Sequence, residues 1–559
     1  MECGRRRTGL RITPLEEARE AVVSTPLQAT ETYHELRTTL PPLLPRYLAS
    51  QRWFGGKARQ IRSAEITDLV PMGNTHLDAF ALPVRLEYTT GPGEMYVLPL
   101  ICTEEPTAES AATGLTVHST ARGTDLRLRN ALTDDDFLHS LLQAIEQKAV
   151  FRGFEGEIHA ASTGVFLSLC GASSGALQPK PIKAEQSNSS IIYGDRVILK
   201  FFRRIEAGEN PDLEIGRFLT ERKNFPHIPA VAGWLDYKGK DDREMSLGIL
   251  QAFVPNVGDA WRFTRKSLSS FWKEAGKYAE GPLGFVPQQD GQVAAYKENL
   301  PAQVLDYIKP YLAAVELLGR RTAELHLALA SELTDPAFAP EPYTAPFQQA
   351  FKETLRTLTE RNLALLRTKS HELPVELRDQ AGDLAARQDE ILQRYDAALL
   401  SPIQAMRTRI HGDYHLGQVL YTGSDFVIID FEGEPARPLS ERRVKRSPLQ
   451  DVAGMLRSFH YAAFSYQLAP SDEMTASEMD NNDARRWAEG WYACVADGFL
   501  SAYLESARGA CFIPPNGDEL STLLRVHLFE KAVYELGYEL NNRPDWVAIP
   551  LAGISQLLK

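Results

Sequence analysis

His411-Gly-Asp-Tyr-His-Leu-Gly-Gln418 and, a few residues later, Val427-Ile-Ile-Asp-Phe-Glu432 form the most informative stretch of the chain. The first part is typical of a loop that carries one carboxylate, Asp413, and an amide five residues later, Gln418. The second part is an apolar strand that ends at another carboxylate, Asp430. Phosphoryl transfer needs a carboxylate that orients the acceptor hydroxyl and oxygen ligands that hold Mg²⁺ on the phosphates. Aspartate is also common in ordinary turns and strand ends, but the two parts in this order favour a phosphotransferase.

A nucleotide-binding half is expected upstream of this stretch. Lys200 closes the apolar strand Val197-Ile-Leu-Lys, which is the position of a lysine that pairs with the α- and β-phosphates. Glu214, on the helix that opens at Pro211, is expected to hold this lysine by an ion pair. Asp212 and Glu209 are competing partners, and the alternative for Lys200 is a solvated residue at a strand end.

Two further segments are expected to contact the nucleotide. A phosphate-covering loop without glycines would use hydroxyl and backbone N–H groups of Ser187, Asn188 and Ser189. The strand 247–254, with Gln251 and Phe253 near its end, is expected to line the adenine site. Gly55-Gly-Lys57 is followed by alanine, so it is not a phosphate-binding P-loop.

Composition limits the class of protein. The 559 residues are 43% hydrophobic and 24% charged, which predicts a globular chain of several domains. A net charge of −12 argues against nucleic acid or an anionic membrane as the main partner. Five scattered cysteines without a CxxC pair fit a reducing compartment. No uninterrupted apolar run approaches the length of a membrane span, so we expect a cytoplasmic protein that binds no membrane.

The order of patterns predicts an α+β fold with a β-rich half followed by a helix-rich half. A Gly194-Asp195 pair between two β-rich runs predicts a hairpin. Helices are expected at 134–150, from Pro211, at 305–329, and as two stretches within 348–400 broken near Pro374. The expected domains are a flexible extension (1–38), a cap subdomain (39–125), an intermediate region with the N-terminal lobe (126–254) and a helical lobe (255–559). His326 is expected in the core rather than as a ligand, and Asp451 is expected to tie the loop that contains Asp413.

The segment Lys531-Ala-Val-Tyr-Glu-Leu-Gly-Tyr-Glu-Leu-Asn-Asn-Arg-Pro-Asp-Trp546 has the composition of a sugar site. A pyranose presents a weakly apolar face and a rim of hydroxyls, so its pocket needs aromatic side chains beside charged ones. Tyr534 and Tyr538 share one helix face, and Glu535 and Glu539 share another. Packing alone is the alternative role for the two tyrosines. Gly537 lies inside this helix at a cost of roughly 1 kcal/mol relative to alanine, and the sequence does not explain it.

HGDxHxxQ followed by DFE resembles the aminoglycoside-phosphotransferase-like kinases, in which Asn is more usual where Gln418 stands. More narrowly, residues 40–559 are similar to the maltokinase family. The resemblance includes Arg52–Arg59, Gln186–Ser190, Ile198–Arg204, Asp430–Pro435, Arg446–Arg457 and Lys531–Trp546.

This resemblance implies a bilobal protein-kinase-like fold with an N-terminal cap, and ATP- and Mg²⁺-dependent phosphorylation of maltose at its anomeric hydroxyl. It implies that Asp413 is the base, that Gln418 and Asp430 hold Mg²⁺, and that Lys200 and Glu214 serve the ATP phosphates. The residues assigned to the sugar are His411, His415, Glu432, Tyr534, Glu535, Tyr538 and Arg543. An association with trehalose synthase or a maltosyltransferase is also implied. The alternatives are a kinase of another sugar, such as glucosamine, and a non-catalytic sugar-binding relative.

Overall fold

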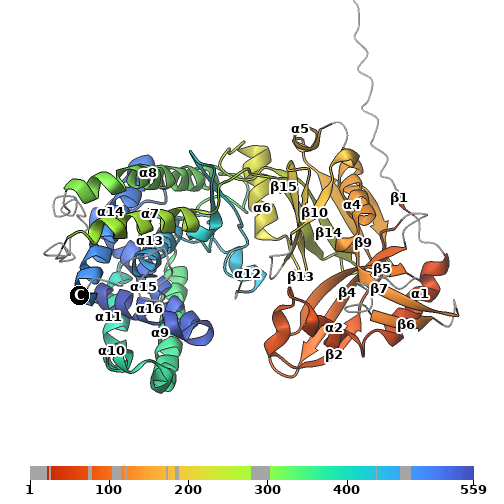
Figure 1. Cartoon of the computed structure of the whole chain (residues 1–559), viewed down its shortest axis with the longest axis horizontal. Coiled ribbons are helices and arrows are strands. Elements are labelled where there is room, and N and C mark those ends of the chain that lie inside the picture. The colour runs from red at the N-terminus through yellow and green to blue at the C-terminus, as the bar shows by residue number, and fades with distance from the viewer. Residues whose placement is uncertain are drawn as a thin grey trace, which may run out of the picture. The chain divides into compact units, whose positions relative to one another are not determined.

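The chain divides into two units in its computed structural model (Figure 1). Unit 1 comprises Met1–Ala207 and Ala232–Leu250, and unit 2 comprises Gly208–Val231 and Gln251–Lys559. The structure describes residues 22–23, 27–73, 78–103, 115–119, 123–171, 174–182, 188–278, 302–435, 437–465 and 480–558. Strands dominate unit 1 and helices dominate unit 2, which confirms the predicted α+β class.

Unit 1 begins with an antiparallel sheet of strand order β2-β4-β5-β7-β6, with β3 and β13 added beside β4 and β5. Its strands are β2 (Ile61–Ile66), β3 (Val70–Pro71), β4 (Ala79–Tyr88), β5 (Glu94–Thr103), β6 (Leu115–Ser119), β7 (Thr124–Asn130) and β13 (Arg204–Ile205). Helices α1 (Leu27–Thr39) and α2 (Leu44–Ser50) contribute buried leucines to the apolar core of this sheet.

The Arg52-Trp-Phe-Gly-Gly-Lys-Ala-Arg59 motif is a packing element of this sheet. Trp53 and Phe54 are buried, and their rings lie 6.1 and 5.3 Å from the ring of Tyr96. Position 56 requires glycine, because a Cβ atom there would lie 2.5 Å from the hydroxyl of Tyr88. The motif therefore stabilises the cap core, as its aromatic composition indicates.

Helix α1 corrects the expectation of a flexible extension up to residue 38. Tyr33 and Leu36 on this helix are buried in the core of the sheet. Their two apolar side chains are one helical turn apart in an otherwise polar segment, a pattern too short to stand out in the sequence.

A second sheet in unit 1 has the strand order β1-β8-β9-β14-β15-β12-β11-β10. Its strands are β1 (Val22–Val23), β8 (Val150–Arg152), β9 (Gly156–Ser162), β10 (Pro179–Pro181), β11 (Asn188–Tyr193), β12 (Val197–Phe202), β14 (Val231–Gly239) and β15 (Glu244–Ala252). The turn between β11 and β12 has Gly194 and Asp195 at φ 56° and 52°, which confirms the predicted hairpin. Helix α4 (Asp135–Gln147) packs on β9. It ends three residues before the predicted residue 150, because Lys148 adopts the left-handed conformation with φ 53°. The short helix α5 (Phe166–Cys170) follows β9.

Unit 2 is mainly helical. Its helices are α6 (Pro211–Arg217), α7 (Ala260–Ala275), α8 (Ala302–Ala330), α9 (Ala345–Lys369), α10 (Val375–Ala386), α11 (Gln388–Ala398), α12 (Leu439–Arg442), α13 (Leu449–Phe464), α14 (Asn481–Ser506), α15 (Gly517–Asn542) and α16 (Ala548–Leu557). Its strands are β16 (Glu341–Pro342), β17 (Met406–Arg407), β18 (Val419–Tyr421) and β19 (Phe426–Ile428). The turns η7 (Leu416–Gln418) and η10 (Pro544–Trp546) precede β18 and α16.

The long amphipathic helix predicted at 305–329 is α8, which packs along α14. The region 348–400 breaks at Pro374, as predicted, and again at Arg387, so it forms three helices rather than two. Trp272 on α7 and Trp487 and Trp491 on α14 are completely buried in the apolar core of unit 2. Within the described residues, no helix combines the length and the apolar composition needed to cross a bilayer.

Candidate active site

The loop His411–Gln418 is fixed by Asp451, near the start of α13. Its carboxylate accepts hydrogen bonds from the backbone N–H groups of His411 (2.7 Å) and Gly412 (2.9 Å). The Nε2 atom of His326, a completely buried residue of α8, lies 3.1 Å from the same carboxylate. These contacts confirm that Asp451 ties the loop and that His326 belongs to the core.

Asp413 lies at the centre of the loop beside a lysine from α15. Its Oδ1 atom is 3.2 Å from Nζ of Lys531, and its Oδ2 atom is 3.9 Å from Nε2 of His415. Burial alone would raise the pKa of Asp413, but the positive charge of Lys531 lowers it below its ordinary value. The carboxylate is therefore ionised at neutral pH, as a general base must be.

The two histidines of the loop have different positions. His415 accepts the N–H of Gly417 at Nδ1 (3.0 Å), so its neutral ring carries the proton on Nε2, which faces Asp413. Burial lowers the pKa of His415, which favours this neutral form. His411 is 1% exposed and its Nε2 lies 2.9 Å from the carbonyl oxygen of Ile429. The assignment of His411 to the sugar is therefore corrected: its side chain joins the loop to the end of β19.

Carboxylates gather where β19 ends. Oxygen atoms of Asp212, Asp430 and Glu432 all lie within 4.8 Å of one another. Gln418 donates from Nε2 to Oδ2 of Asp430 (2.8 Å), which brings its amide to the same place. Asp430 adopts φ 69°, so its backbone turns sharply between the strand and Phe431. This oxygen-only donor set fits Mg²⁺, which prefers carboxylates and water.

Two assignments change at this cluster. Glu432, expected to contact the sugar, lies with Asp430, and it does not line the cavity of about 890 Å³ beside Asp413. Asp212, weighed only as a partner of Lys200, is 1% exposed and accepts the backbone N–H of Phe431 (2.9 Å). This position of Asp212 was not predictable from local patterns, because Asp212 and Asp430 are more than 200 residues apart.

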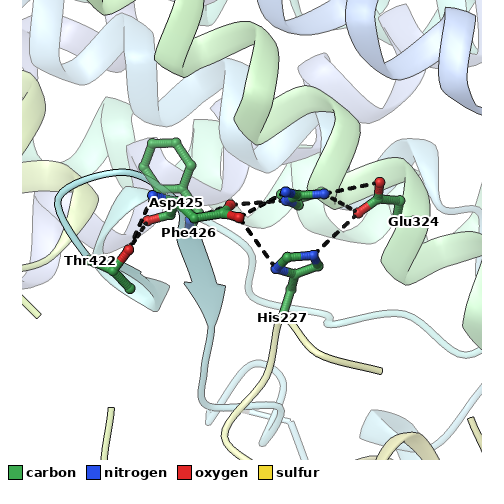
Figure 2. Close-up of polar contacts among 6 residues, drawn as sticks. His227, Glu324, Thr422, Asp425 and Phe426 are labelled. Carbon is green, nitrogen blue, oxygen red and sulfur yellow. Dashed lines mark hydrogen bonds and ion pairs between the residues drawn. The ribbon is translucent and has the colours of Figure 1, made fainter. Parts of the chain in front are cut away.

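The hairpin that separates Gln418 from Asp430 is braced by charged groups (Figure 2). Asp425, at the start of β19, pairs with the guanidinium of Arg321 on α8 at 2.9 and 2.8 Å. Figure 2 shows the imidazole of His227 between Asp425 and Glu324. Its Nδ1 atom lies 4.0 Å from Oδ2 of Asp425, and its Nε2 atom lies 3.7 Å from Oε2 of Glu324. The backbone of His227 also accepts the N–H of Ile428 (2.8 Å). These contacts hold the hairpin that carries both candidate metal ligands.

Glu214 has two arginine partners within unit 2. Arg443 binds its carboxylate at 2.7 and 3.1 Å, and Arg409 lies 2.7 Å from Oε2. Lys200 is on β12 of unit 1, where its Nζ atom lies 5.8 Å from the ring of Phe202. The expected ion pair between Lys200 and Glu214 stays a prediction.

The other residues expected at the nucleotide lie on neighbouring strands. Asn188 and Ser189 begin β11, which pairs with the strand of Lys200, and Gln251 lies near the end of β15 on the other side of that strand. The Ser189 hydroxyl accepts a hydrogen bond from Nε of Arg203 (2.9 Å). Phe253 directly follows β15 and is partly buried. Ser187 lies outside the described residues.

A cavity of about 890 Å³ opens beside Asp413. Its lining comes from the loop, from one stripe of α13, from α15 with η10, and from α7. The lining residues are Asp413, His415, Gly417, Pro435, Gly454, Ser458, Tyr461, Ser465, Lys531, Tyr534, Glu535, Tyr538, Glu539, Arg543, Trp546, Trp261 and Arg265. The structure thus brings five of the seven residues predicted to bind the sugar to one cavity that also contains the predicted base.

Charged and aromatic side chains alternate along this cavity. Arg543 pairs with Glu539 at 2.7 Å and lies over the rings of Tyr538 and Trp546, at 5.4 and 4.7 Å. Burial raises the pKa of Glu539, although Arg543 opposes the shift. In the same cavity, Glu535 accepts two hydrogen bonds from Arg457 at 2.9 and 2.7 Å. Flat apolar surfaces beside charged hydrogen-bonding groups are what a sugar pocket requires.

The structure explains Gly537. A Cβ atom at this position would lie 2.5 Å from Oδ1 of Asn362 on α9. The Asn362 amide in turn donates to the carbonyl oxygen of Val533 (2.8 Å), one turn earlier on α15. Glycine therefore allows a buried asparagine to fix α15 against α9.

Lys531, Tyr461 and the α7 residues Trp261 and Arg265 also line the cavity, although they were not predicted as site residues. Lys531 stands three and four residues before Tyr534 and Glu535, so helical spacing alone would have placed it on their face. No comparable pattern marks Trp261, since its helix is remote in sequence from every motif.

Known proteins share parts of this architecture. Residues 282–491 match the phosphotransferase enzyme family, and residues 47–134 match the maltokinase N-terminal cap domain. Glucosamine kinase of Mycolicibacterium smegmatis is 25% identical over 453 residues, which cover 78% of this chain and 92% of the relative. Glucosamine kinase of Streptacidiphilus jiangxiensis is 22% identical over 379 residues, 67% of this chain and 73% of the relative. A glucosamine kinase solved with glucosamine, ADP and inorganic phosphate has a TM-score of 0.58 at 18% identity, covering 92% of this chain and 99% of its own.

The chain therefore has a kinase-like fold with an N-terminal cap domain. The match of residues 282–491 to the phosphotransferase enzyme family indicates a kinase, and the match of residues 47–134 indicates a cap domain of the maltokinase type.

Proposed function

We propose that this chain transfers the γ-phosphoryl group of ATP to a sugar, and that the sugar is maltose, phosphorylated at its anomeric hydroxyl. The observation that carries the proposal is the single cavity shared by Asp413 and the aromatic and charged residues of α15. A base beside a sugar-type pocket is the arrangement that sugar phosphorylation requires.

In the proposed mechanism, Asp413 accepts the proton of the acceptor hydroxyl as that oxygen attacks the γ-phosphorus and ADP leaves. The phosphoryl group moves in line, so the rate depends on positioning and on neutralising charge rather than on a covalent intermediate. Mg²⁺ would be held by Gln418, Asp430, Asp212 and Glu432, and would neutralise phosphate charge when bound. Lys200 is proposed to bind the ATP phosphates. The ADP found with the solved glucosamine kinase supports the choice of nucleotide.

The extent of the cavity supports a disaccharide. The α13 residues that line it run from Gly454, packed against the carbonyl of Tyr414, to Ser465. Eleven helical steps span about 16 Å, which is longer than one pyranose ring. Trp261 and Trp546 add aromatic surface to the same cavity. A pyranose ring bound at Asp413 would therefore leave room in the cavity for a second pyranose ring.

Glucosamine is the second candidate, because both curated relatives named above are glucosamine kinases. An ammonium group needs a carboxylate that is not already neutralised. Near Asp413, however, Glu535 is paired with the buried Arg457, and Glu434 is paired with Arg437 at 2.5 Å. Glu539 is likewise paired with Arg543. These pairs favour a neutral sugar over an amino sugar.

Initial-rate assays with maltose, glucose, trehalose and glucosamine test the proposal. ADP release should depend on the sugar and be fastest with maltose, and ³¹P NMR of the product should show an anomeric phosphate. Faster turnover of glucosamine, or phosphate on another hydroxyl, would replace maltose or the anomeric position in the proposal. ATP consumption that no sugar stimulates would remove sugar kinase activity altogether.

A further inference from the structure

Lys531 is a partly buried lysine between the candidate base and the candidate sugar-binding residues. It lies on α15, one turn before Tyr534 and Glu535, and its side chain is 25% exposed. Its Nζ atom is 3.2 Å from Oδ1 of Asp413 and 5.1 Å from the ring centroid of Tyr534. The three residues line the same cavity.

The groups around this pair keep it in its charged form. Burial alone would lower the pKa of Lys531, but Asp413, Glu535 and Glu434 raise it above the ordinary value. Asp413 is faced by Lys531 from α15 and by His415 and His411 from its own loop. Of these, Lys531 has the largest influence on the ionisation of Asp413.

The geometry also constrains the carboxylate in space. One oxygen of Asp413 is held by Lys531, and the other faces the Nε2–H side of His415. In the productive complex the acceptor hydroxyl must lie within about 3 Å of one of these oxygens. When that oxygen is Oδ1, the ammonium group is at most about 6 Å from the acceptor oxygen.

We propose that Lys531 is the positioning residue of the base: it orients Asp413, keeps it ionised, and couples it to the helix that binds the sugar. The proposal rests on the proposed function, because it assigns a role in that reaction. It predicts that Lys531 acts on catalysis through Asp413 and affects nucleotide binding little. A mere packing role would predict lost stability without a change in the pH profile.

The test uses the full chain and whichever sugar the unchanged protein phosphorylates. Lys531→Met removes the charge at similar length, Lys531→Arg keeps it, and Lys531→Gln is a second neutral variant in case the first fails to fold. Lys369→Met is the matched control, since Lys369 binds the carbonyl of Leu540 on the same helix (2.9 Å) and is not part of the cavity lining.

Lys531→Met or Lys531→Gln should lower kcat roughly 10- to 100-fold, the usual effect of removing a residue that orients a catalytic group. The KM for ATP should change less than threefold. Since Lys531 lowers the pKa of Asp413, its removal raises that pKa, and the acidic limb of kcat/KM should move to higher pH. Lys531→Arg should restore most of kcat and return the limb toward its original position, and Lys369→Met should change neither.

An unchanged acidic limb in both neutral variants would overturn the proposal. So would a loss seen only in the KM for the sugar, which would make Lys531 a sugar-binding residue instead. If the unchanged protein phosphorylates no sugar, the proposed function fails first. If it phosphorylates a sugar and the neutral variants keep its kcat and pH profile, only the role of Lys531 fails.

Discussion

Nε2 of Gln418 lies 2.8 Å from Oδ2 of Asp430, and this hydrogen bond brings together the two ends of the β18–β19 hairpin. Asp212 and Glu432 place two more carboxylates within 4.8 Å of Asp430. Carboxylate oxygens gathered in this way are the ligands that Mg²⁺ prefers, so we propose this cluster as the site of the cation.

Asp212→Asn tests whether this residue helps to hold the metal. The amide keeps the shape and can still accept the N–H of Phe431, but one negative charge is lost. We expect the Mg²⁺ concentration for half-maximal activity to rise about tenfold, with kcat at saturating Mg²⁺ largely retained. Asp396→Asn, in a surface ion pair with Lys352, is the control. An unchanged Mg²⁺ requirement would limit Asp212 to a structural role.

Asp451→Asn should weaken both the loop and its catalysis. The carboxylate accepts two backbone N–H bonds from the loop and faces His326, and an amide cannot serve all three as an acceptor. We expect the free energy of unfolding to fall by about 2–3 kcal/mol, measured in urea, and kcat to fall with it. Wild-type stability and kcat together would show that the loop holds its shape without this residue.

Gly537→Ala should destabilise the protein, although alanine is the better helix former by roughly 1 kcal/mol. The added methyl group would meet the Asn362 amide at 2.5 Å, and overpacking of this kind costs about 1–3 kcal/mol. Truncating the asparagine makes room for the methyl group. In an Asn362→Ala background, Gly537→Ala should therefore lower the free energy of unfolding by less than it does in the unchanged protein. Equal costs in the two backgrounds, measured by urea unfolding, would contradict the packing explanation.

Trp261→Ala tests the second sugar ring. Loss of its aromatic surface should weaken maltose binding about tenfold while changing glucose binding less than twofold. Calorimetric titration of both sugars measures the difference, and Tyr307→Ala, on the exposed face of α8, is the control. Equal losses for both sugars would place Trp261 at the reacting ring instead.

Local patterns predicted much of this molecule. The hairpin at Gly194 and Asp195, helix α8, and the Asp413 loop each depend on residues close together in sequence. The gathering of Tyr534, Tyr538 and Arg543 at Asp413 agrees with the resemblance to the maltokinase family.

The parts that escaped prediction depend on distant contacts. Asp212 reaches Asp430 only through the packing of α6, and Trp261 reaches the cavity only through the packing of α7. The contacts of His411 with Ile429 and of Glu432 with Asp430 could not be predicted, because a place in a motif does not fix which way a side chain points. Gly537 needed Asn362, a residue of another helix, for its explanation.

The most direct test of the central claim is the turnover of Asp413→Asn in the maltose-dependent assay, with ATP binding measured on the same preparation by calorimetry. The account predicts that kcat falls at least 1,000-fold, while the Kd for ATP stays within threefold and the protein remains folded. Maltose phosphorylation at more than one tenth of the unchanged rate would contradict it, because the cavity around Asp413 would then not be where the phosphoryl group is transferred.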